Sequence, residues 1–138
     1  MSNGKTTLTV RYGAIDDADW QNTNSRGGQE YAYRFDGPNV NDHKGKGRFK
    51  SVLGFPPARN PKKDYEVELA GDERFEIDHV DVHYGGNQFT GSKVSKSKAK
   101  LDNANSRYQQ GFYCIVVKDT SNNDDLIDCD PMISNEPK

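Results

Sequence analysis

The sequence predicts a single all-β sandwich of two antiparallel sheets, with about seven short strands joined by long polar loops. Three observations support this fold class. Several short segments alternate apolar and polar residues with the period of two that a half-buried strand requires. No segment keeps the spacing of three and four residues that an amphipathic helix needs. The connections are long and polar, and the glycine-periodic repeat of a propeller or solenoid is missing.

The first two strands are predicted at Thr6–Tyr12 and Gln29–Phe35, which alternate strictly. Pro38 ends the second strand region, because proline cannot donate to a ladder. Between the two strands, Ile15–Gly28 is rich in Asp, Asn, Ser and Gly, and we expect a long loop with Trp20 as its one apolar anchor. The residues expected to face the core are Leu8, Val10, Tyr12, Tyr31, Tyr33 and Phe35.

The middle of the chain is predicted to contain a polar loop and three strands. The polar stretch Asn39–Gly47 precedes a short strand at Arg48–Gly54, which ends before two prolines. The strands at Asp64–Leu69 and Phe75–Tyr84 are expected to form a hairpin through the turn Ala70–Glu73.

One irregularity is predicted inside the strand that begins at Phe75. Phe75 and Ile77 share one parity, whereas Val80, Val82 and Tyr84 share the other. One extra residue near Asp78 or His79 reconciles the two sets, and such an insertion is a β-bulge. The following stretch, Gly85–Ser106, has little apolar content, so we expect a long mobile loop, with a helical turn or two at Lys96–Ala104 as the alternative.

The chain is predicted to close with a hairpin of Gly111–Asp119 and Leu126–Ser134 around a polar turn. A turn centred between Ser121 and Asn122 places Cys114 opposite Cys129 and Val116 opposite Ile127. Two interpretations of the cysteines follow. They are either thiols that pack, which a cytoplasmic location favours, or a strained cross-strand disulfide.

Composition sets the class of protein. The chain has 138 residues, a net charge of -2 and a pI near 5.9, so no global field favours nucleic acid or an anionic membrane. The start lacks the apolar run of a signal peptide, and no stretch approaches the roughly 20 apolar residues of a membrane span. We therefore expect one domain over residues 1–138, a cytoplasmic location, and neither a membrane nor a nucleic acid as partner.

The carboxyl-terminal stretch carries a resemblance to a known group. Tyr113–Asp119, followed by Asp130–Pro131 and Glu136–Pro137, resembles the DP-EP family of small bacterial proteins. The resemblance covers Gly111–Pro137. It implies an immunoglobulin-like sandwich and supplies no catalytic residues. Taken by itself, Asp130–Pro131 is typical of an edge strand that resists edge-to-edge association.

The sharpest candidate site is His79, Asp81 and His83, which alternate on one face of a strand. Imidazoles two residues apart on a strand can ligate zinc or a similar ion with a further ligand from elsewhere. The simpler interpretation is a solvated outer face, because Val80 and Val82 take the inward positions.

Charged and oxygen-rich segments give weaker candidates. Asp16, Asp17 and Asp19, and the run Asn122–Asp125, offer calcium ligands but lack the spacing of a calcium loop, and ordinary turn chemistry explains them. A basic patch that contacts phosphate groups would form only if three lysine- and arginine-rich segments converge. The simpler interpretation is that these segments are charged, solvated loops. The three segments are His43–Lys50, Arg59–Lys63 and Lys93–Lys100.

Four aromatic residues could form a sugar platform, although core packing also explains them: Tyr12, Trp20, Tyr84 and Tyr108. The sequence has neither a nucleophile elbow nor a phosphate-binding glycine motif. It therefore predicts a non-enzymatic binding module without a cofactor, which binds a protein partner or itself through its long loops. The alternatives are a metal-binding protein or metal-dependent enzyme at His79, Asp81 and His83, and a carbohydrate-binding module.

Overall fold

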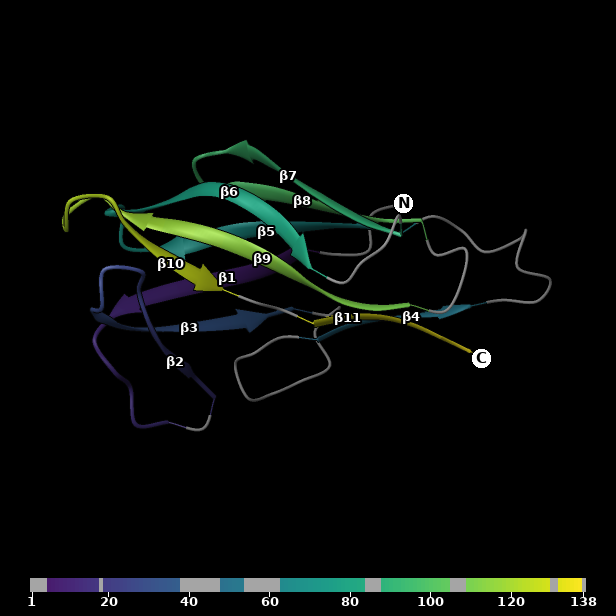
Figure 1. The fold of residues 1–138 in the computed structure, drawn as a ribbon, viewed down its shortest axis with the longest axis horizontal. Helices are drawn as coiled ribbons and strands as arrows, with labels where there is room; N and C mark the ends of the chain where they lie inside the picture. Colours follow the sequence, from purple (N-terminus) through teal and green to yellow (C-terminus); the bar gives the residue numbers. More distant parts are fainter. Residues whose placement is uncertain are drawn as a thin grey trace.

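The protein is an all-β sandwich (Figure 1). The structure is a computed structural model that describes residues 5–17, 19–37, 48–53, 63–83, 88–104, 109–129 and 132–137. These ranges contain eleven strands, and none of them contains a helix long and apolar enough to cross a membrane. The predicted all-β sandwich is confirmed, with more strands than the about seven expected.

Six strands form the first sheet. Its order is β2 (Gln21–Asn24), β3 (Glu30–Asp36), β1 (Lys5–Tyr12), β5 (Lys63–Gly71), β8 (Lys98–Asn103) and β7 (Phe89–Ser95). The second sheet has five strands. β9 (Gln109–Asp119) is central, and one of its edges pairs with β6 (Phe75–His83). Its other edge pairs with two strands, β10 (Asp125–Cys129) along its second half and β11 (Met132–Pro137) along its first. β4 (Arg48–Leu53) then pairs with β11.

The pairing departs from a purely antiparallel pattern at two places, because β1 pairs with β5 and β11 pairs with β4 in parallel. Both sheets contribute to one hydrophobic core. The core includes Leu8, Val10, Tyr31, Tyr33, Phe35, Tyr65, Val67, Phe75, Ile77, Leu101, Tyr113, Ile115, Val117 and Ile127. Of the predicted core residues of the first two strands, only Tyr12, at the end of β1, is exposed.

The predicted bulge in β6 is confirmed. Ile77 lies opposite Val117 and His79 lies opposite Val116, so Asp78 is the extra residue. Inward positions therefore change from odd to even numbers along β6, and Val80 and Val82 pack against the core as expected.

The predicted hairpin between β5 and β6 is wrong. Both edges of β5 are taken by β1 and β8, whereas β6 pairs with β9 in the second sheet. The chain crosses between the layers directly after Gly71. This residue has a φ of 105°, which residues other than glycine rarely adopt. The two segments present their apolar faces to the same core from opposite sides, and their alternation alone does not distinguish this arrangement from edge pairing.

Two of the predicted loops contain strands. The expected loop at Ile15–Gly28 includes β2, and most of the expected loop at Gly85–Ser106 is the antiparallel pair β7–β8, with no helical turn over its described residues. In β8 the buried positions are Ala99, Leu101 and Asn103. Only Leu101 among these is a large apolar residue, and Lys98 and Lys100 occupy the alternate positions. The segment therefore lacks a recognisable apolar–polar alternation in the sequence. The expected loop at Asn39–Gly47 lies outside the described residues.

The predicted register of the terminal hairpin is wrong by one residue. The turn has five residues, Thr120–Asp124, and Asp125 lies opposite Asp119. Cys129 therefore lies opposite Ile115, not Cys114, and a shift of one residue moves side chains to opposite faces of a sheet. Cys129 lies in the core and Cys114 on the outer face of β9; they form no disulfide, as the thiol interpretation expected.

Backbone hydrogen bonds link the layers at both lateral edges. On one side, the Arg26 amide donates to the Leu126 carbonyl, 2.8 Å away. On the other, the Lys96 carbonyl in the turn between β7 and β8 accepts from the Ile77 amide of β6, 2.7 Å away. These bonds hold the ends of the two sheets together.

Gly91 in β7 packs tightly against Val80 of β6. A Cβ atom at this position would lie 2.5 Å from Val80 Cγ1 and 3.4 Å from Leu101 Cδ2. We expect Gly91→Ala to lower the free energy of unfolding by roughly 1–3 kcal/mol, since a methyl group forced into a packed core displaces its neighbours. Urea unfolding measures the change. Ser92→Ala, at the exposed neighbouring position, is the control, and equal stability of the two variants would contradict this packing.

Candidate functional site

A hollow opens where β5 ends before β1. In the parallel register Val10 lies opposite Gly71, so Arg11 and Tyr12 extend past the last residue of β5. The chain then turns towards the second sheet through Asp72, whose carboxylate accepts from the Arg74 amide at 3.1 Å and whose carbonyl accepts from the Phe75 amide at 3.2 Å. This crossing leaves a space beside the end of β1.

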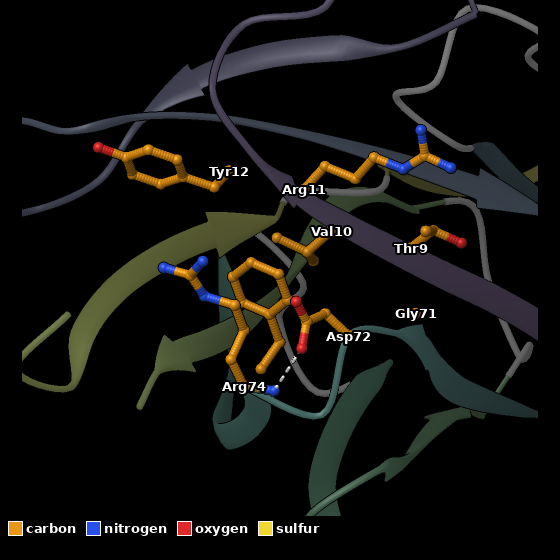
Figure 2. Close-up of a pocket in the computed structure, with 8 residues that line it drawn as sticks. Thr9, Val10, Arg11, Tyr12, Gly71, Asp72 and Arg74 are labelled. Atoms are coloured by element: carbon orange, nitrogen blue, oxygen red, sulfur yellow. Dashed lines mark hydrogen bonds between the residues drawn. The ribbon is translucent and has the colours of Figure 1, made fainter. Parts of the chain in front are cut away.

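We call this space the Tyr12 hollow (Figure 2). Its volume is about 330 Å³, and it is lined by Thr9, Val10, Arg11, Tyr12, Gly71, Asp72, Arg74 and Phe75. Tyr12 is 55% exposed. Its ring contacts the buried Tyr31 ring edge to face, with 5.2 Å between centroids, and its hydroxyl donates to Gln29 Oε1 at 3.1 Å.

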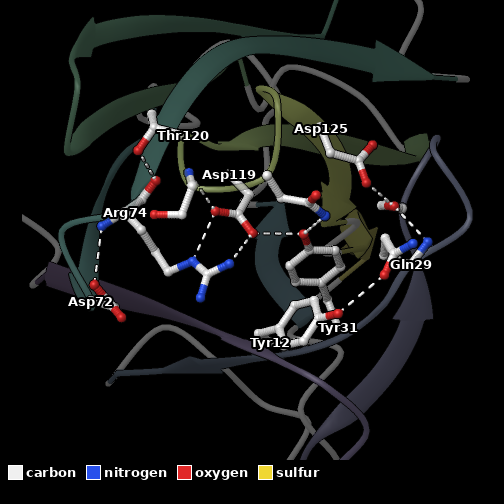
Figure 3. A network of polar contacts seen from close by, with 11 residues as sticks. Tyr12, Gln29, Tyr31, Asp72, Arg74, Asp119, Thr120 and Asp125 are labelled. Carbon is white, nitrogen blue, oxygen red and sulfur yellow. Dashed lines mark hydrogen bonds and ion pairs between the residues drawn. The ribbon is translucent and has the colours of Figure 1, made fainter.

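The position of Arg74 in the hollow is fixed by a buried carboxylate (Figure 3). Asp119 is fully buried. Its Oδ1 accepts from Arg74 Nε at 2.8 Å and its Oδ2 accepts from Arg74 Nη2 at 2.7 Å. The guanidinium carbon also lies 5.3 Å from the centroid of the Tyr12 ring and 5.4 Å from that of Phe75, a cation–π distance for both rings.

Two further donors complete the shell of Asp119. The Tyr31 hydroxyl donates to Oδ2 at 2.7 Å, and the Ser121 amide donates to Oδ1 at 3.0 Å. The Asn122 side-chain amide donates in turn to the Tyr31 hydroxyl oxygen at 3.1 Å. Asp119 therefore accepts four hydrogen bonds, which occupy the roughly four lone-pair positions of a carboxylate.

These contacts shift the ionisation of the network away from neutrality. Burial alone would raise the pKa of Asp119, but the hydrogen bonds from Arg74, Tyr31 and Ser121 outweigh it and hold this pKa below 3.8. Burial is the main cause that raises the pKa of Tyr31 to about 12. The hydrogen bonds to Asp119 raise the pKa of Arg74 further above its ordinary value. These three groups keep one charge state around neutral pH.

Arg11 lines the hollow, but its charged guanidinium lies outside it. Its guanidinium lies over the Trp20 ring, 4.9 Å from the centroid. Figure 2 shows this guanidinium directed away from Tyr12 and Arg74, as expected for neighbouring residues on one strand. The polar side chains at the hollow are therefore chiefly Asp72, Arg74 and the Tyr12 hydroxyl.

A second polar cluster lies on the outer face of the second sheet. Arg26, from the turn between β2 and β3, reaches Asp128 of β10 with Nη2 at 2.8 Å and Nε at 3.3 Å. The Cys114 thiol donates to Asp128 Oδ1 at 3.6 Å. His79 lies on the same face with Nδ1 2.5 Å from Asp78 Oδ2 and Nε2 3.1 Å from Asp81 Oδ2.

The predicted metal triad lies on the outer face of β6, with Asp81 and His83 exposed. Both ring nitrogens of His79 contact carboxylates, an arrangement that suits an imidazolium more than a metal ligand. Within the described ranges, no group of three His, Cys, Asp or Glu side chains is placed to hold a metal ion. The structure thus supports the solvated outer face.

The calcium candidates serve as turn residues. Asp17 Oδ1 accepts from the Asp19 amide at 2.9 Å. In the second segment, Asp125 accepts from the Gly27 amide at 2.8 Å and from the Ser25 hydroxyl, so its carboxylate ties the turn between β2 and β3 to β10. The first segment follows the turn chemistry expected for it, whereas in the second segment the side chains of Asn122 and Asp125 bond to residues far away in the sequence.

The lysine run lies on β7, β8 and the turn between them, where Lys96, Lys98 and Lys100 approach Glu76, Glu66 and Asp102 at 3.8, 3.6 and 3.7 Å. This mixture of charges supports the solvated-surface interpretation. The segments His43–Lys50 and Arg59–Lys63 lie largely outside the described residues. So do Tyr84 and Tyr108 of the predicted aromatic platform, whose other members, Tyr12 and Trp20, both lie near the end of β1.

Sequence reasoning missed Arg74, Asp119 and Tyr31, which form the centre of the site. Asp119 lies 45 residues from Arg74 and 88 from Tyr31 in the chain, so no local motif joins them. One signal for this site is present in the sequence. Asp119 ends an apolar strand and alternates with the inward-facing Tyr113, Ile115 and Val117, so its carboxylate is expected to point into the core.

No protein-family model and no curated protein matches this chain, so the resemblance to the DP-EP family stays a prediction. Two solved structures show a weak likeness. A variant of an endo-fucoidan hydrolase from glycoside hydrolase family 107 is 9% identical, with a TM-score of 0.42, and covers 95% of this chain. The unsubstituted enzyme gives 9% identity, a TM-score of 0.40 and 95% coverage. This chain spans 24% of each of those chains, and the likeness is too weak to transfer an activity.

We expect Arg74→Ala to lower the free energy of unfolding by about 3 kcal/mol, because it leaves the Asp119 carboxylate buried without its cation. Denaturant unfolding at neutral pH measures the loss. Arg34→Ala is the matched control, since the Arg34–Asp36 pair lies on the surface with side chains 38% and 50% exposed. It should cost less than about 1 kcal/mol. Equal losses in the two variants would show that Asp119 does not depend on Arg74.

We expect NMR titration to give His79 a pKa above its ordinary 6.5. The hydrogen bond that the His79 imidazolium donates to Asp78 is the main cause, burial opposes it, and Asp81 adds to it. The proton on His79 therefore stabilises the fold below pH 6.5, and this contribution is lost as the pH rises through the higher folded-state value. Asp78→Asn should lower the pKa of His79, whereas Asp16→Asn should leave it unchanged. An unaltered titration in Asp78→Asn would refute the assignment.

Proposed function

We propose that the protein is a non-enzymatic binding module whose ligand lies in the Tyr12 hollow. One observation carries this proposal. An aromatic side chain with 55% of its surface exposed lies beside Arg74, whose guanidinium donates two hydrogen bonds to a buried carboxylate that holds it in place. Tyr and Arg are enriched among the residues that carry most of the binding energy at protein interfaces.

The fixed position of Arg74 supports binding. Ordering a long, flexible side chain at a binding site costs roughly 0.5–1.5 kcal/mol. The Asp119 hydrogen bonds and the flanking Tyr12 and Phe75 rings already hold the guanidinium in the unliganded protein. A ligand that contacts Arg74 therefore avoids much of this cost.

The ionisation of the network supports a binding role over an enzymatic one. General acid–base catalysis works best with a group that titrates near the operating pH. The pKa of Asp119 lies below 3.8 and that of Tyr31 at about 12, while Arg74 stays charged. These groups are suited to holding a ligand in place.

The size of the hollow favours a small molecule, or one end of a larger one, as the ligand. Its volume of about 330 Å³ is near the lower limit of ligand sites, which run from roughly 300 to 1,000 Å³. A protein partner or a second copy of the chain, expected from the sequence, stays a separate prediction. So does a cytoplasmic location.

The proposal is tested by screening a chemically diverse fragment library against the ¹⁵N-labelled protein by NMR. We expect binders to shift the amides of Tyr12, Gly71, Asp72 and Arg74 together. Tyr12→Leu keeps an apolar contact with Tyr31 but removes the aromatic face and hydroxyl, and it should weaken binding up to about tenfold. The control is Val94→Ala, at a side chain that is 61% exposed on β7.

A screen in which no fragment shifts the hollow amides would overturn the proposal. So would a screen in which the binders shift only amides of the outer face of the second sheet, around His79 and Asp128. Equal weakening by Tyr12→Leu and Val94→Ala would place the ligand elsewhere as well.

A further inference from the structure

We infer that the ligand of the Tyr12 hollow is a neutral saccharide unit. This inference rests on the proposed binding function and specifies the chemical class of the ligand. It is argued from the hydrogen-bonding capacity of Asp72 and Arg74, from the exposed ring of Tyr12, and from the balance of charge around them.

The hollow offers both donors and acceptors at close range. A guanidinium has five N–H donors, of which Arg74 uses two on Asp119, so three have no hydrogen-bond partner among the described residues. One carboxylate oxygen of Asp72 accepts from the Arg74 amide, and the other has no partner within the described part of the chain. Sugar hydroxyls both donate and accept, so a saccharide satisfies both sets at once.

The Tyr12 ring supplies the apolar component. A pyranose ring has C–H groups that form apolar patches between its hydroxyls, and such patches pack against an aromatic surface while the hydroxyls bond to neighbouring polar groups. Tyr12 is anchored by its edge-to-face contact with Tyr31 and by its hydroxyl bond to Gln29, and still has more than half of its surface exposed. An anchored aromatic side chain presents this surface at low entropic cost.

The charges around the hollow favour a neutral ligand. The Arg74 cation is compensated by Asp119, and the Arg11 guanidinium is directed away over Trp20. Asp72 adds a carboxylate at the hollow itself, which would repel a phosphate, sulfate or carboxylate ligand. A cationic ammonium or guanidinium ligand would offer no acceptor to the remaining Arg74 donors. A neutral ligand that carries both donors and acceptors avoids both drawbacks.

The experiment titrates the ¹⁵N-labelled full chain with saccharides of defined charge. The neutral probes are maltotriose, cellotriose and xylotriose, and the anionic probes are trigalacturonate, inorganic sulfate and inorganic phosphate. We expect at least one neutral trisaccharide to shift the amides of Tyr12, Gly71, Asp72 and Arg74, and to shift them more than any anionic probe does at the same concentration.

Asp72→Asn tests the acceptor directly. The asparagine carbonyl can keep the bond to the Arg74 amide, so the turn is retained, but the charged acceptor is lost. We expect roughly tenfold or greater weakening for the neutral saccharide and tighter binding of the anionic probes. Glu73→Gln, with the same change of charge one residue away at an exposed position outside the hollow lining, should leave the neutral affinity unchanged.

Three results would overturn the inference. If the anionic probes shift the hollow amides and the neutral ones do not, the hollow is an anion site, and the binding function stands. If the fragment library gives binders at the hollow but no saccharide does, the ligand belongs to another class, and the binding function again stands. If neither fragments nor saccharides reach the hollow, the binding function falls together with the inference.

Discussion

The arrangement of this sandwich depends on one buried carboxylate. Asp119 ends the central strand of the second sheet, receives the Tyr31 hydroxyl from the first sheet, and holds Arg74 at the point where the chain has just crossed between them. A buried charge is tolerated only when it is paired and hydrogen-bonded. Satisfying Asp119 therefore fixes the two sheets, the crossing connection and the side of the Tyr12 hollow relative to one another.

Alternation of apolar and polar residues locates β1, β3, β5, β6, β9 and β10, which supply most of the core. It fails at β7 and β8, whose core residues Phe89, Ala99 and Leu101 stand among polar ones, and at β2. β2 is wholly polar and takes its register from β3, while Asn22 bonds to the backbone of Ile15. The terminal turn has five residues, an odd number, whereas the predicted register requires an even number. Asn123 and Asp124, at the end of this turn, both adopt left-handed backbone angles. Asn and Asp tolerate that conformation, but their presence does not specify it.

The candidate site was less accessible to sequence reasoning than the fold. Tyr12 was singled out as an aromatic residue, although its predicted companions Tyr84 and Tyr108 lie outside the described residues. Arg74 and Asp119 occupy ordinary positions in the sequence, one in a turn and one at a strand end. Their contact depends on the crossing between the sheets, and a crossing cannot be distinguished from a hairpin by periodicity alone. The site follows from topology, which becomes available only with the fold.

The hydrogen bonds that link the two sheets at their lateral edges also protect the molecule. Exposed strand edges are templates on which foreign chains can polymerise. Here the Leu126 carbonyl of β10 accepts from the Arg26 amide on one flank, and the Ile77 amide of β6 donates to the Lys96 carbonyl on the other. An incoming strand would have to displace these intramolecular partners first. A highly polar chain with a modest core thereby gains resistance to amyloid-like growth at these places without spending proline or charge on them.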